Sequence, residues 1–272
     1  MPKIELGPIG AALSPAKGTA FVDAAIELEG LGYSTIWLTG GQLDSLGQIA
    51  DVVRATRRVR VASGIISVDR FEPEAVAASY AEIEATHPGR FIVGLGGAHG
   101  PKPLQTLAAY LDALGSVPAT ARVMAALGPR MLELGRDRAA GALSVLVTPE
   151  YTARARSLLG DDTTLAIEQL VVLEADPERA RQIARRPLGF LSTVPAYPAN
   201  FRRMGFAEDD IAQLGDRLVD AVVAWGDLDT VAARIAEHVQ AGANHVALGV
   251  TTGSPDTIPV DQWRQLATAL IP

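Results

Sequence analysis

Residues 88–100 read Pro-Gly-Arg-Phe-Ile-Val-Gly-Leu-Gly-Gly-Ala-His-Gly, an apolar run of strand length between turn-forming residues. Such a run predicts a buried strand of a parallel sheet that ends in a glycine-rich loop. Upstream, residues 74–86 have helical periodicity, and their apolar face consists of Val76, Ala77, Tyr80 and Ile83. A helix followed by a buried strand is the repeating unit of an alternating α/β fold.

The same unit recurs along the whole chain. We predict eight strands, over Ile4–Ala12, Ser34–Leu38, Val59–Ile66, Phe91–Gly96, Arg122–Leu127, Ala142–Val147, Leu165–Leu173 and His245–Val250. The first seven follow one another at roughly 20 to 32 residues, the size of a βα unit in an eightfold barrel. The sequence therefore predicts the α/β class and a (β/α)8 TIM barrel.

The interval between the seventh and eighth strands is longer, at about 70 residues. It is too long for one crossover and too short for a separate domain. We therefore expect a single domain over residues 1–272 with a helical insertion at about 177–240. Barrel enzymes vary their loops at the carboxyl rim, so we expect the proline-punctuated stretch Val194–Asn200 to pass over the mouth.

An open doubly wound sheet is the alternative to a barrel. Gly94 and Gly96 supply the first two glycines of a dinucleotide-binding motif, but the third glycine position holds His99. The segment also follows the fourth strand, whereas the motif belongs after the first. The spacing thus favours the barrel.

The composition excludes several classes of function. A net charge of −7 disfavours a nucleic-acid partner, which needs a basic face. The apolar runs are shorter than the ~20 residues of a membrane span, and the first residues do not resemble a signal peptide. The absence of Cys excludes thiolate chemistry and suits a reducing cytoplasm. The sequence also lacks the common metal-hydrolase motifs, so no metal site is expected.

Several predicted strand ends are rich in glycine or polar residues and would open on one face of the barrel. Such ends suit a phosphate-bearing cofactor and supply few catalytic groups of their own. After the fourth strand, Gly96, Gly97 and Ala98 would let a ligand lie on the backbone, and His99 is a candidate proton donor. The alternative is a tight turn that leaves His99 merely exposed.

Two helix starts follow the next strands. Gly128 precedes Pro129, which leaves a helix N-terminus bare of side chains and open to an anion, and Arg130 adds positive charge. Thr148 has the position of an N-cap, so ordinary capping competes with ligand contact there.

The seventh strand carries a polar pair, Glu168-Gln169, in an otherwise apolar run. Burying such groups costs free energy unless they are paired or face a ligand. We therefore expect one of the two to face the pocket, and Glu168 is the second candidate for proton transfer.

Several strings resemble a known family. Ala62-Ser-Gly-Ile65 and the Pro88–Gly96 run resemble the luciferase-like flavin and deazaflavin oxidoreductases. More narrowly, four further strings resemble an actinobacterial subfamily of oxidoreductases dependent on the deazaflavin coenzyme F420. They are residues 125–134, 146–156, 168–173 and 215–226.

The resemblance implies a homodimer of luciferase-like barrels with a cofactor lying across each mouth. It also implies a non-prolyl cis peptide at Ser63-Gly64 or Gly64-Ile65 against the cofactor ring, and a phosphate held after strands four to six. The implied cofactor-binding residues are Thr39, Ser63, Gly64, Ile65, Gly96, Gly97, Ala98, Ala126, Gly128, Arg130 and Thr148. Coenzyme F420 is the favoured cofactor and FMN the alternative.

The resemblance leads to three functional hypotheses. The first is hydride transfer between F420 and a small organic substrate, with His99 or Glu168 handling the proton. The others are an FMN-dependent luciferase-like monooxygenase and a non-catalytic flavin- or deazaflavin-binding protein. Relatives that oxidise sugar phosphates or emit light carry a His after the second strand, where this chain has Thr39-Gly40-Gly41, so those substrates are not supported.

Overall fold

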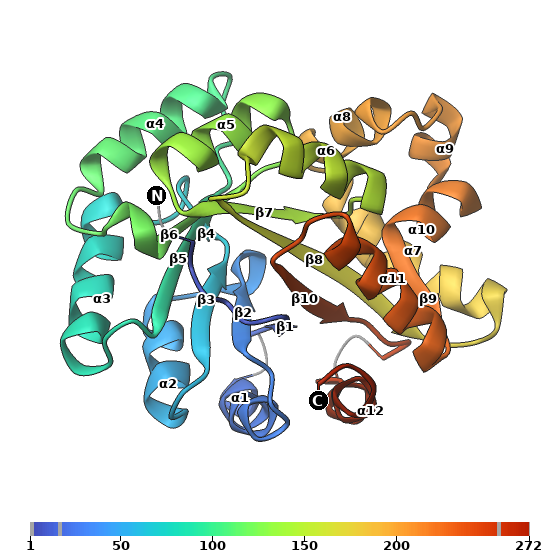
Figure 1. Cartoon of the computed structure of the whole chain (residues 1–272), viewed down its shortest axis with the longest axis horizontal. Coiled ribbons are helices and arrows are strands. Elements are labelled where there is room, and N and C mark those ends of the chain that lie inside the picture. The colour runs from blue at the N-terminus through green and yellow to red at the C-terminus, as the bar shows by residue number, and fades with distance from the viewer. Residues whose placement is uncertain (1–2, 16–17, 255–256, 272) are drawn as a thin grey trace.

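The computed structural model describes residues 3–15, 18–254 and 257–271. Within them, eight parallel strands close into a barrel in the order β10-β1-β2-β3-β5-β6-β7-β8, and β8 pairs back to β10 (Figure 1). The barrel strands are β1 Ile9–Leu13, β2 Thr35–Thr39, β3 Arg60–Gly64, β5 Phe91–Gly96, β6 Arg122–Ala125, β7 Gly141–Val145, β8 Thr164–Leu173 and β10 His245–Val250. The predicted TIM barrel is thereby confirmed.

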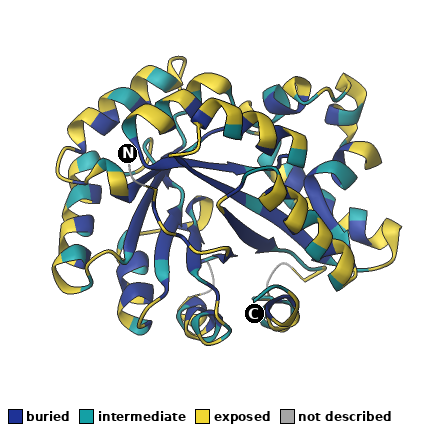
Figure 2. Cartoon of the chain, in the orientation of Figure 1, coloured by how far each residue is buried: buried dark blue, intermediate teal, exposed yellow. Residues whose placement is uncertain are grey.

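Helices alternate with the strands and cover the outside of the barrel. They are α1 Ala20–Gly30, α2 Gly47–Ala55, α3 Pro73–Thr86, α4 Pro103–Ala113, α5 Pro129–Arg138, α6 Pro149–Leu159, α11 Leu228–Gln240 and α12 Val260–Leu270. Two short 3-10 turns, Gly40–Gln42 and Ala119–Ala121, lie in connections. Each helix buries one stripe and exposes the other, so the strands are dark and the outer helix faces light in Figure 2. None of these described helices has the length and apolar character of a membrane span.

The first strand begins later than predicted. The sequence indicates a strand from Ile4, whereas β1 starts at Ile9, because Gly7 has a left-handed backbone (φ 73°) and Pro8 cannot donate to a sheet ladder. Ile4 and Leu6 instead join the apolar cluster inside the barrel, and the Ile4 N–H donates to Thr164 Oγ1 at 3.0 Å. The segment therefore closes the amino-terminal end of the barrel.

The barrel interior is narrow and mostly apolar. Its cluster includes Ala12, Trp37, Ala62, Ala166 and Ala247, so one large ring is accommodated by small neighbours. The Trp37 Nε1 donates to His245 Nε2 at 2.9 Å, and His245 Nδ1 donates to the Gly7 carbonyl at 2.7 Å. Burial lowers the pKa of His245 to about 4, so this histidine is a neutral structural residue.

The segment between β8 and β10 contains more than helices. The helices α7 Pro177–Leu191, α8 Ala196–Arg203, α9 Glu208–Gln213 and α10 Asp216–Val222 lead into a strand, β9 Val223–Gly226. A helical insertion at about 177–240 was expected, and the structure adds the strand β9 to its helices. The physical reason is the length of β8, which runs past β7 and leaves backbone groups that β9 pairs from Leu170 to Leu173.

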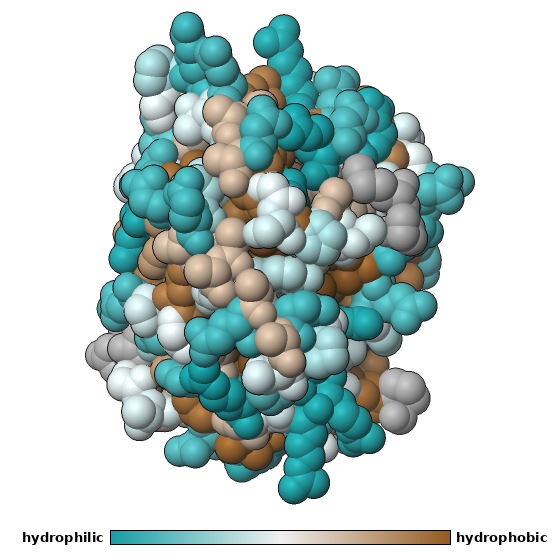
Figure 3. Space-filling model, turned by 90° about the vertical axis from the view of Figure 1, so that its left-hand side faces the viewer, coloured by the Kyte–Doolittle hydropathy of each residue, from teal (hydrophilic) through white to brown (hydrophobic). Residues whose placement is uncertain are grey.

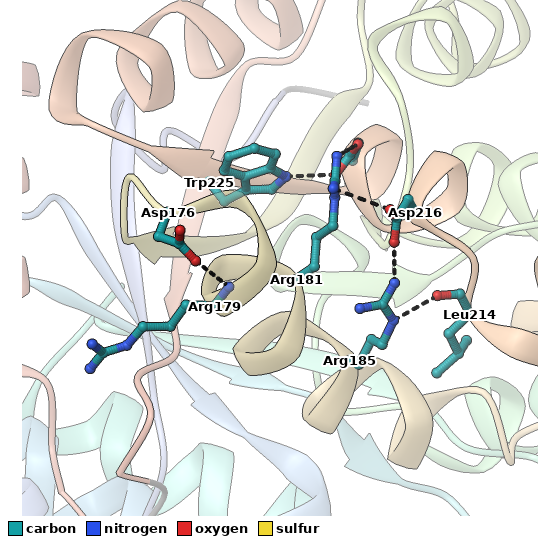
Figure 4. Close-up of polar contacts among 8 residues, drawn as sticks. Asp176, Arg179, Arg181, Arg185, Leu214, Asp216 and Trp225 are labelled. Carbon is teal, nitrogen blue, oxygen red and sulfur yellow. Dashed lines mark hydrogen bonds and ion pairs between the residues drawn. The ribbon is translucent and has the colours of Figure 1, made fainter.

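Charged side chains join the helices of the insertion to one another and to β9 (Figure 4). Arg181 on α7 donates to both carboxylate oxygens of Asp220, at 2.9 and 2.7 Å, and its guanidinium lies over the Trp225 ring. The Trp225 Nε1 donates to the same Asp220 at 2.8 Å. Arg185 contacts Asp216 and donates to the Leu214 carbonyl at 3.0 Å. These contacts make α7, α10 and β9 one packed unit.

The outer surface over the side of α3 and α4 gives no sign of a large apolar patch. In Figure 3, hydrophilic side chains surround scattered apolar ones across that face. Such scattering is ordinary for a protein surface.

Glu29 provides a test of how the helix layer is joined to the barrel. Its carboxylate, in the last turn of α1, accepts backbone N–H bonds from Arg57, Arg58 and Val59, which lead into β3. Burial acts to raise the pKa of Glu29, but the three N–H bonds outweigh it and lower that pKa. We expect Glu29→Gln to reduce the free energy of unfolding by about 1–3 kcal/mol at neutral pH, measured by urea denaturation.

The sign of the pH dependence follows from the lowered pKa. The contribution of Glu29 is full above the unfolded-state value of about 4.3 and is lost as pH falls through the lower folded-state pKa. The matched control is Glu27→Gln, which removes an exposed ion pair with Arg264 and should cost less than about 1 kcal/mol. Equal unfolding midpoints for the two variants would contradict the assigned role.

Candidate active site

The carboxyl ends of the strands form a mouth lined mainly by small residues. Alternate strand residues face inward, and Ala62, Ile92, Val123, Leu143, Ala166 and Ala247 make one inward layer. The next inward positions toward the mouth are Gly64, Gly94, Ala125, Val145, Glu168 and Gly249. Within this described ring Glu168 is the one ionisable side chain.

One wall of the mouth is built from the end of β3. The peptide bond between Gly64 and Ile65 is cis, at one of the two positions that the resemblance implies. After it, the short strand β4 Ile66–Ser67 pairs with Leu95 and Gly96 of β5. Gly96 has no room for a side chain, because a Cβ there would lie 2.8 Å from Ala125 Cβ and 3.2 Å from the Ile65 side chain.

Ser63 lies behind this wall, not in it. Its hydroxyl is fully buried, donates to the Gly94 carbonyl at 2.9 Å and accepts the Gly94 N–H at 2.9 Å. Ala126 is likewise buried, and its carbonyl accepts the hydroxyls of Ser144 and Tyr151. Both residues were predicted as cofactor contacts, and in the structure their polar contacts hold neighbouring strands together.

The loop after β5 carries the other predicted contacts. Gly97 has a left-handed backbone (φ 76°), and a Cβ there would lie 2.7 Å from Ser67 Oγ, so glycine is required. Ala98 is half-buried, and His99 is exposed. The Asp69 carboxylate accepts a hydrogen bond from the His99 backbone N–H at 2.9 Å, and the same carboxylate lies 2.8 Å from His99 Nδ1. His99 therefore joins two loops at the rim.

A positively charged corner lies at the start of α5. Gly128 is the N-cap of this helix, and Arg130 is exposed in its first turn. Arg203, from α8 of the insertion, lies close by, because a Cβ on Gly128 would be 3.7 Å from Arg203 Nη2. The Arg203 guanidinium, together with Arg130 in the first turn, thus adds positive charge to the positive end of the helix dipole.

The two predicted threonines, Thr39 and Thr148, lie at the rim. Thr148 caps α6, accepting the Tyr151 N–H at 3.3 Å as ordinary capping requires. Thr39 ends β2 half-buried, and its hydroxyl lies 3.3 Å from Gln42 Oε1. Both therefore have partners within the protein.

Glu168 faces the mouth from the wall opposite Gly64 and Ile65, because β8 and β3 are four strands apart in either direction around the barrel. The side chain is half-buried, and within the described residues its carboxylate has no hydrogen bond or ion pair. Its Oε1 lies 3.3 Å from the place a Cβ on Gly249 would occupy. Burial raises the pKa of Glu168 to about 7, so the group can both take and give a proton near neutrality.

Gln169 faces the other way and is satisfied. Its amide donates to the carbonyls of Leu170 and Val222 and accepts from His238 Nε2 at 2.9 Å. His238 Nδ1 in turn accepts the Thr152 hydroxyl at 2.8 Å. Burial lowers the pKa of His238 to about 4, so this chain of polar groups is neutral and structural.

Tyr197 comes from α8, within the stretch expected over the mouth. Its ring packs on the apolar cluster that the insertion forms with Leu146 and Leu170. Burial and the nearby charge of Glu168 both raise the pKa of Tyr197, so the phenol stays protonated. The sequence indicated the stretch that contains Tyr197 but not Tyr197 itself, and it gave no signal for Arg203, because the contacts of both residues depend on the folding of the insertion.

Two hollows in the described part of the molecule are lined by residues other than the inward ring that contains Glu168. One of about 510 Å³ is bounded by Glu174, Asp227 and Gln265 beyond the carboxyl ends of β8 and β9. Another of about 410 Å³ lies at the amino-terminal end of the barrel, beside Arg60 and Phe91. Among the described residues no cluster of three His, Asp or Glu side chains could hold a metal ion.

Comparison with known proteins agrees with this geometry at the level of the fold. Residues 8–113 match the family described as luciferase-like monooxygenase. No curated protein matches the chain by sequence.

Solved structures match over nearly the whole chain. An F420-dependent secondary alcohol dehydrogenase in complex with an F420-acetone adduct aligns with a TM-score of 0.76 at 14% identity, covering 99% of each chain. The coenzyme F420-dependent tetrahydromethanopterin reductase from Methanopyrus kandleri aligns at 0.72 and 17%, covering 97% of this chain and 98% of that one.

A monooxygenase gives a similar match. The oxygenating constituent of 3,6-diketocamphane monooxygenase of Pseudomonas putida, in complex with FMN, aligns at 0.64 and 14%, covering 96% of each chain. The protein thus has the luciferase-like TIM barrel fold that these F420 and FMN enzymes share.

Proposed function

We propose that the chain is a luciferase-like oxidoreductase that transfers a hydride between coenzyme F420, held across the barrel mouth, and a small organic substrate. The family match over residues 8–113 and the fold shared with two enzymes described by their use of F420 support this proposal. The observation that carries it is the unpaired carboxyl of Glu168 facing a wall of small residues. FMN is the second candidate, since a protein of the same fold is described in complex with it.

The mouth fits a flat ring with an anionic tail. Small residues line the wall around Gly64, Ile65 and Gly96, and a Cβ at Gly96 would collide with that wall. At the other end, the α5 N-terminus with Arg130 and Arg203 has the charge that a phosphate needs. We assign the ring to Gly64, Ile65, Gly96, Gly97 and Ala98, with Thr39 beside it. The phosphate is assigned to Gly128, Arg130, Thr148 and Arg203.

In this assignment, bound F420 supplies the hydride chemistry, and the protein supplies orientation and a proton. Glu168 lies across the mouth from the ring-binding wall, so a substrate between them meets the carboxyl. A group with a pKa near 7 is suited to general acid–base catalysis. His99 is the other candidate, but its Nδ1 contacts Asp69 at the exposed rim, and we therefore rank Glu168 first.

Titration of the protein with F420, FMN and riboflavin, followed by absorbance, tests the cofactor. We expect F420 to bind more tightly than FMN, and Arg203→Ala to weaken both by roughly tenfold or more, because a charged hydrogen-bond donor to phosphate is lost. Riboflavin has no phosphate, so its affinity should not change. The matched control is Arg202→Ala. Arg202 is the neighbour of Arg203 on α8, and its exposed side chain forms an ion pair with Glu208. A clear preference for FMN would favour the monooxygenase hypothesis.

Glu168→Gln tests the acid–base assignment. We expect turnover to fall by about 10²–10⁴-fold while cofactor affinity is retained. His99→Ala should reduce turnover less than Glu168→Gln does. A protein that binds cofactor tightly but turns over no acceptor or donor would instead be the non-catalytic binding protein.

The raised pKa of Glu168 also predicts a change in stability without any cofactor. Between the unfolded-state value of about 4.3 and the folded-state pKa near 7, the folded protein binds the extra proton, so stability falls as pH rises through this window. Glu168→Gln should therefore raise the thermal midpoint at pH 8 relative to wild type more than it does at pH 5. If Glu168→Gln shifted the thermal midpoint equally at pH 8 and pH 5, the Glu168 carboxyl would not be desolvated.

A further inference from the structure

Glu168 and Tyr197 meet at one corner of the mouth. Val145 is paired in register with Glu168 on the neighbouring strand, and Leu170 is the next inward residue along β8. Leu170 belongs to the apolar cluster against which both Val145 and the Tyr197 ring pack. The barrel thus contributes a carboxyl, and the insertion contributes a phenol, at the same apolar boundary.

The phenol of Tyr197 is distinguished from the other tyrosines by its lack of a partner. The hydroxyls of Tyr33, Tyr110 and Tyr151 each donate to a backbone carbonyl. Tyr80 interacts with Glu84. Within the described residues the Tyr197 hydroxyl makes no hydrogen bond, and neither does the Glu168 carboxylate. Two neighbouring polar groups at an apolar boundary are therefore both left for a ligand.

We propose that Tyr197 and Glu168 together bind the reacting oxygen of a small, uncharged alcohol or ketone. This inference rests on the proposed function and adds the substrate class. The Tyr197 hydroxyl donates a hydrogen bond to the substrate oxygen, and Glu168 exchanges a proton with it. The apolar residues Val145 and Leu170 contact the carbon skeleton.

The chemistry of the pair favours an uncharged oxygen over a charged group. A carboxylate substrate would be repelled by ionised Glu168. An ammonium group can pair with ionised Glu168, but it has no lone pair to accept the Tyr197 hydrogen bond and so leaves that donor unsatisfied. A hydroxyl or carbonyl oxygen satisfies both groups, since it accepts from the phenol and shares its proton with the carboxyl.

The oxidation step balances with the cofactor already proposed. The substrate O–H bond breaks and its proton passes to the Glu168 carboxylate. Bound oxidised F420 would accept the hydride, with its two electrons, as the carbinol C–H bond breaks and a C=O bond forms. Tyr197 keeps its proton throughout, and the reverse direction reduces the ketone with the proton of Glu168.

Binding of an isosteric series tests the substrate class without turnover. Cyclohexanol, cyclohexylamine and cyclohexanecarboxylate, together with cyclohexanone, are titrated into the cofactor-loaded protein and into the apo-protein. We expect the alcohol and ketone to bind and the two ions to bind at least tenfold more weakly. Preferred binding of the amine or the acid, or binding of none of the four, would overturn the proposal.

Tyr197→Phe tests the phenol, with Tyr110→Phe as the matched control that removes a hydroxyl on α4. The infrared carbonyl band of bound cyclohexanone should lie at lower frequency in wild type and Tyr110→Phe than in Tyr197→Phe, because the hydrogen bond weakens the C=O bond. We expect kcat/KM for cyclohexanol to fall roughly tenfold or more in Tyr197→Phe alone. An unchanged carbonyl band in Tyr197→Phe would contradict the assigned hydrogen bond.

The two possible failures can be told apart. If wild-type protein does not bind F420 in the absorbance titration, the proposed function is wrong. If F420 binds and the alcohol and ketone show no preference over the ions, only the substrate class is wrong.

Discussion

The length of β8 is the constraint on which the candidate site depends. β8 has 10 residues and its neighbour β7 has 5, because β7 ends where Leu146 takes a left-handed backbone (φ 56°). The backbone groups of β8 beyond that point must still be paired. β9 pairs with them, and the inward side chains Leu170 and Val172 then become the base of a second apolar cluster under α7, α8 and α10. Glu168 lies where the barrel interior gives way to this cluster.

None of the four histidines lies in the inward ring that contains Glu168. His238 and His245 are buried in complete sets of hydrogen bonds, with pKa values of about 4, so they stay neutral near pH 7. His87 lies at the end of α3 and contacts Thr86, and His99 contacts Asp69 at the rim. In the proposed assignment, the inward carboxyl of Glu168, with a pKa near 7, takes the role that a histidine often fills.

Much of the barrel could be predicted from the sequence because its signals are local. The strand over Phe91–Gly96 is bounded by glycine turns, and the helix from Pro73 begins with proline, so short windows contain the information. The start of β1 and the strand β9 were missed, since each depends on a distant partner. Ile4 contacts Thr164, and β9 forms only because β8 offers an edge.

The site was harder to predict for the same reason. The polar pair Glu168-Gln169 was visible in the sequence, but only the register of β8 decides which of the two faces the mouth. Ser63 and Ala126 lie at the expected strand ends, yet their polar groups are used between strands. The stretch that contains Tyr197 was expected over the mouth, but neither Tyr197 nor Arg203 could be singled out, because no periodic pattern ties the insertion to a strand end.

Helix α8 has only eight residues, yet it carries both Tyr197 and Arg203. Arg203 follows Tyr197 by six positions, which span about 9 Å of α-helix. The helix therefore extends from the Tyr197 side chain near Glu168 to the Arg203 side chain near the N-terminus of α5. A movement of α8 shifts Tyr197 and Arg203 together. The two halves of a ligand complex would thus be coupled mechanically, and a substitution that tilts α8 would disturb the phosphate end and the reacting oxygen together.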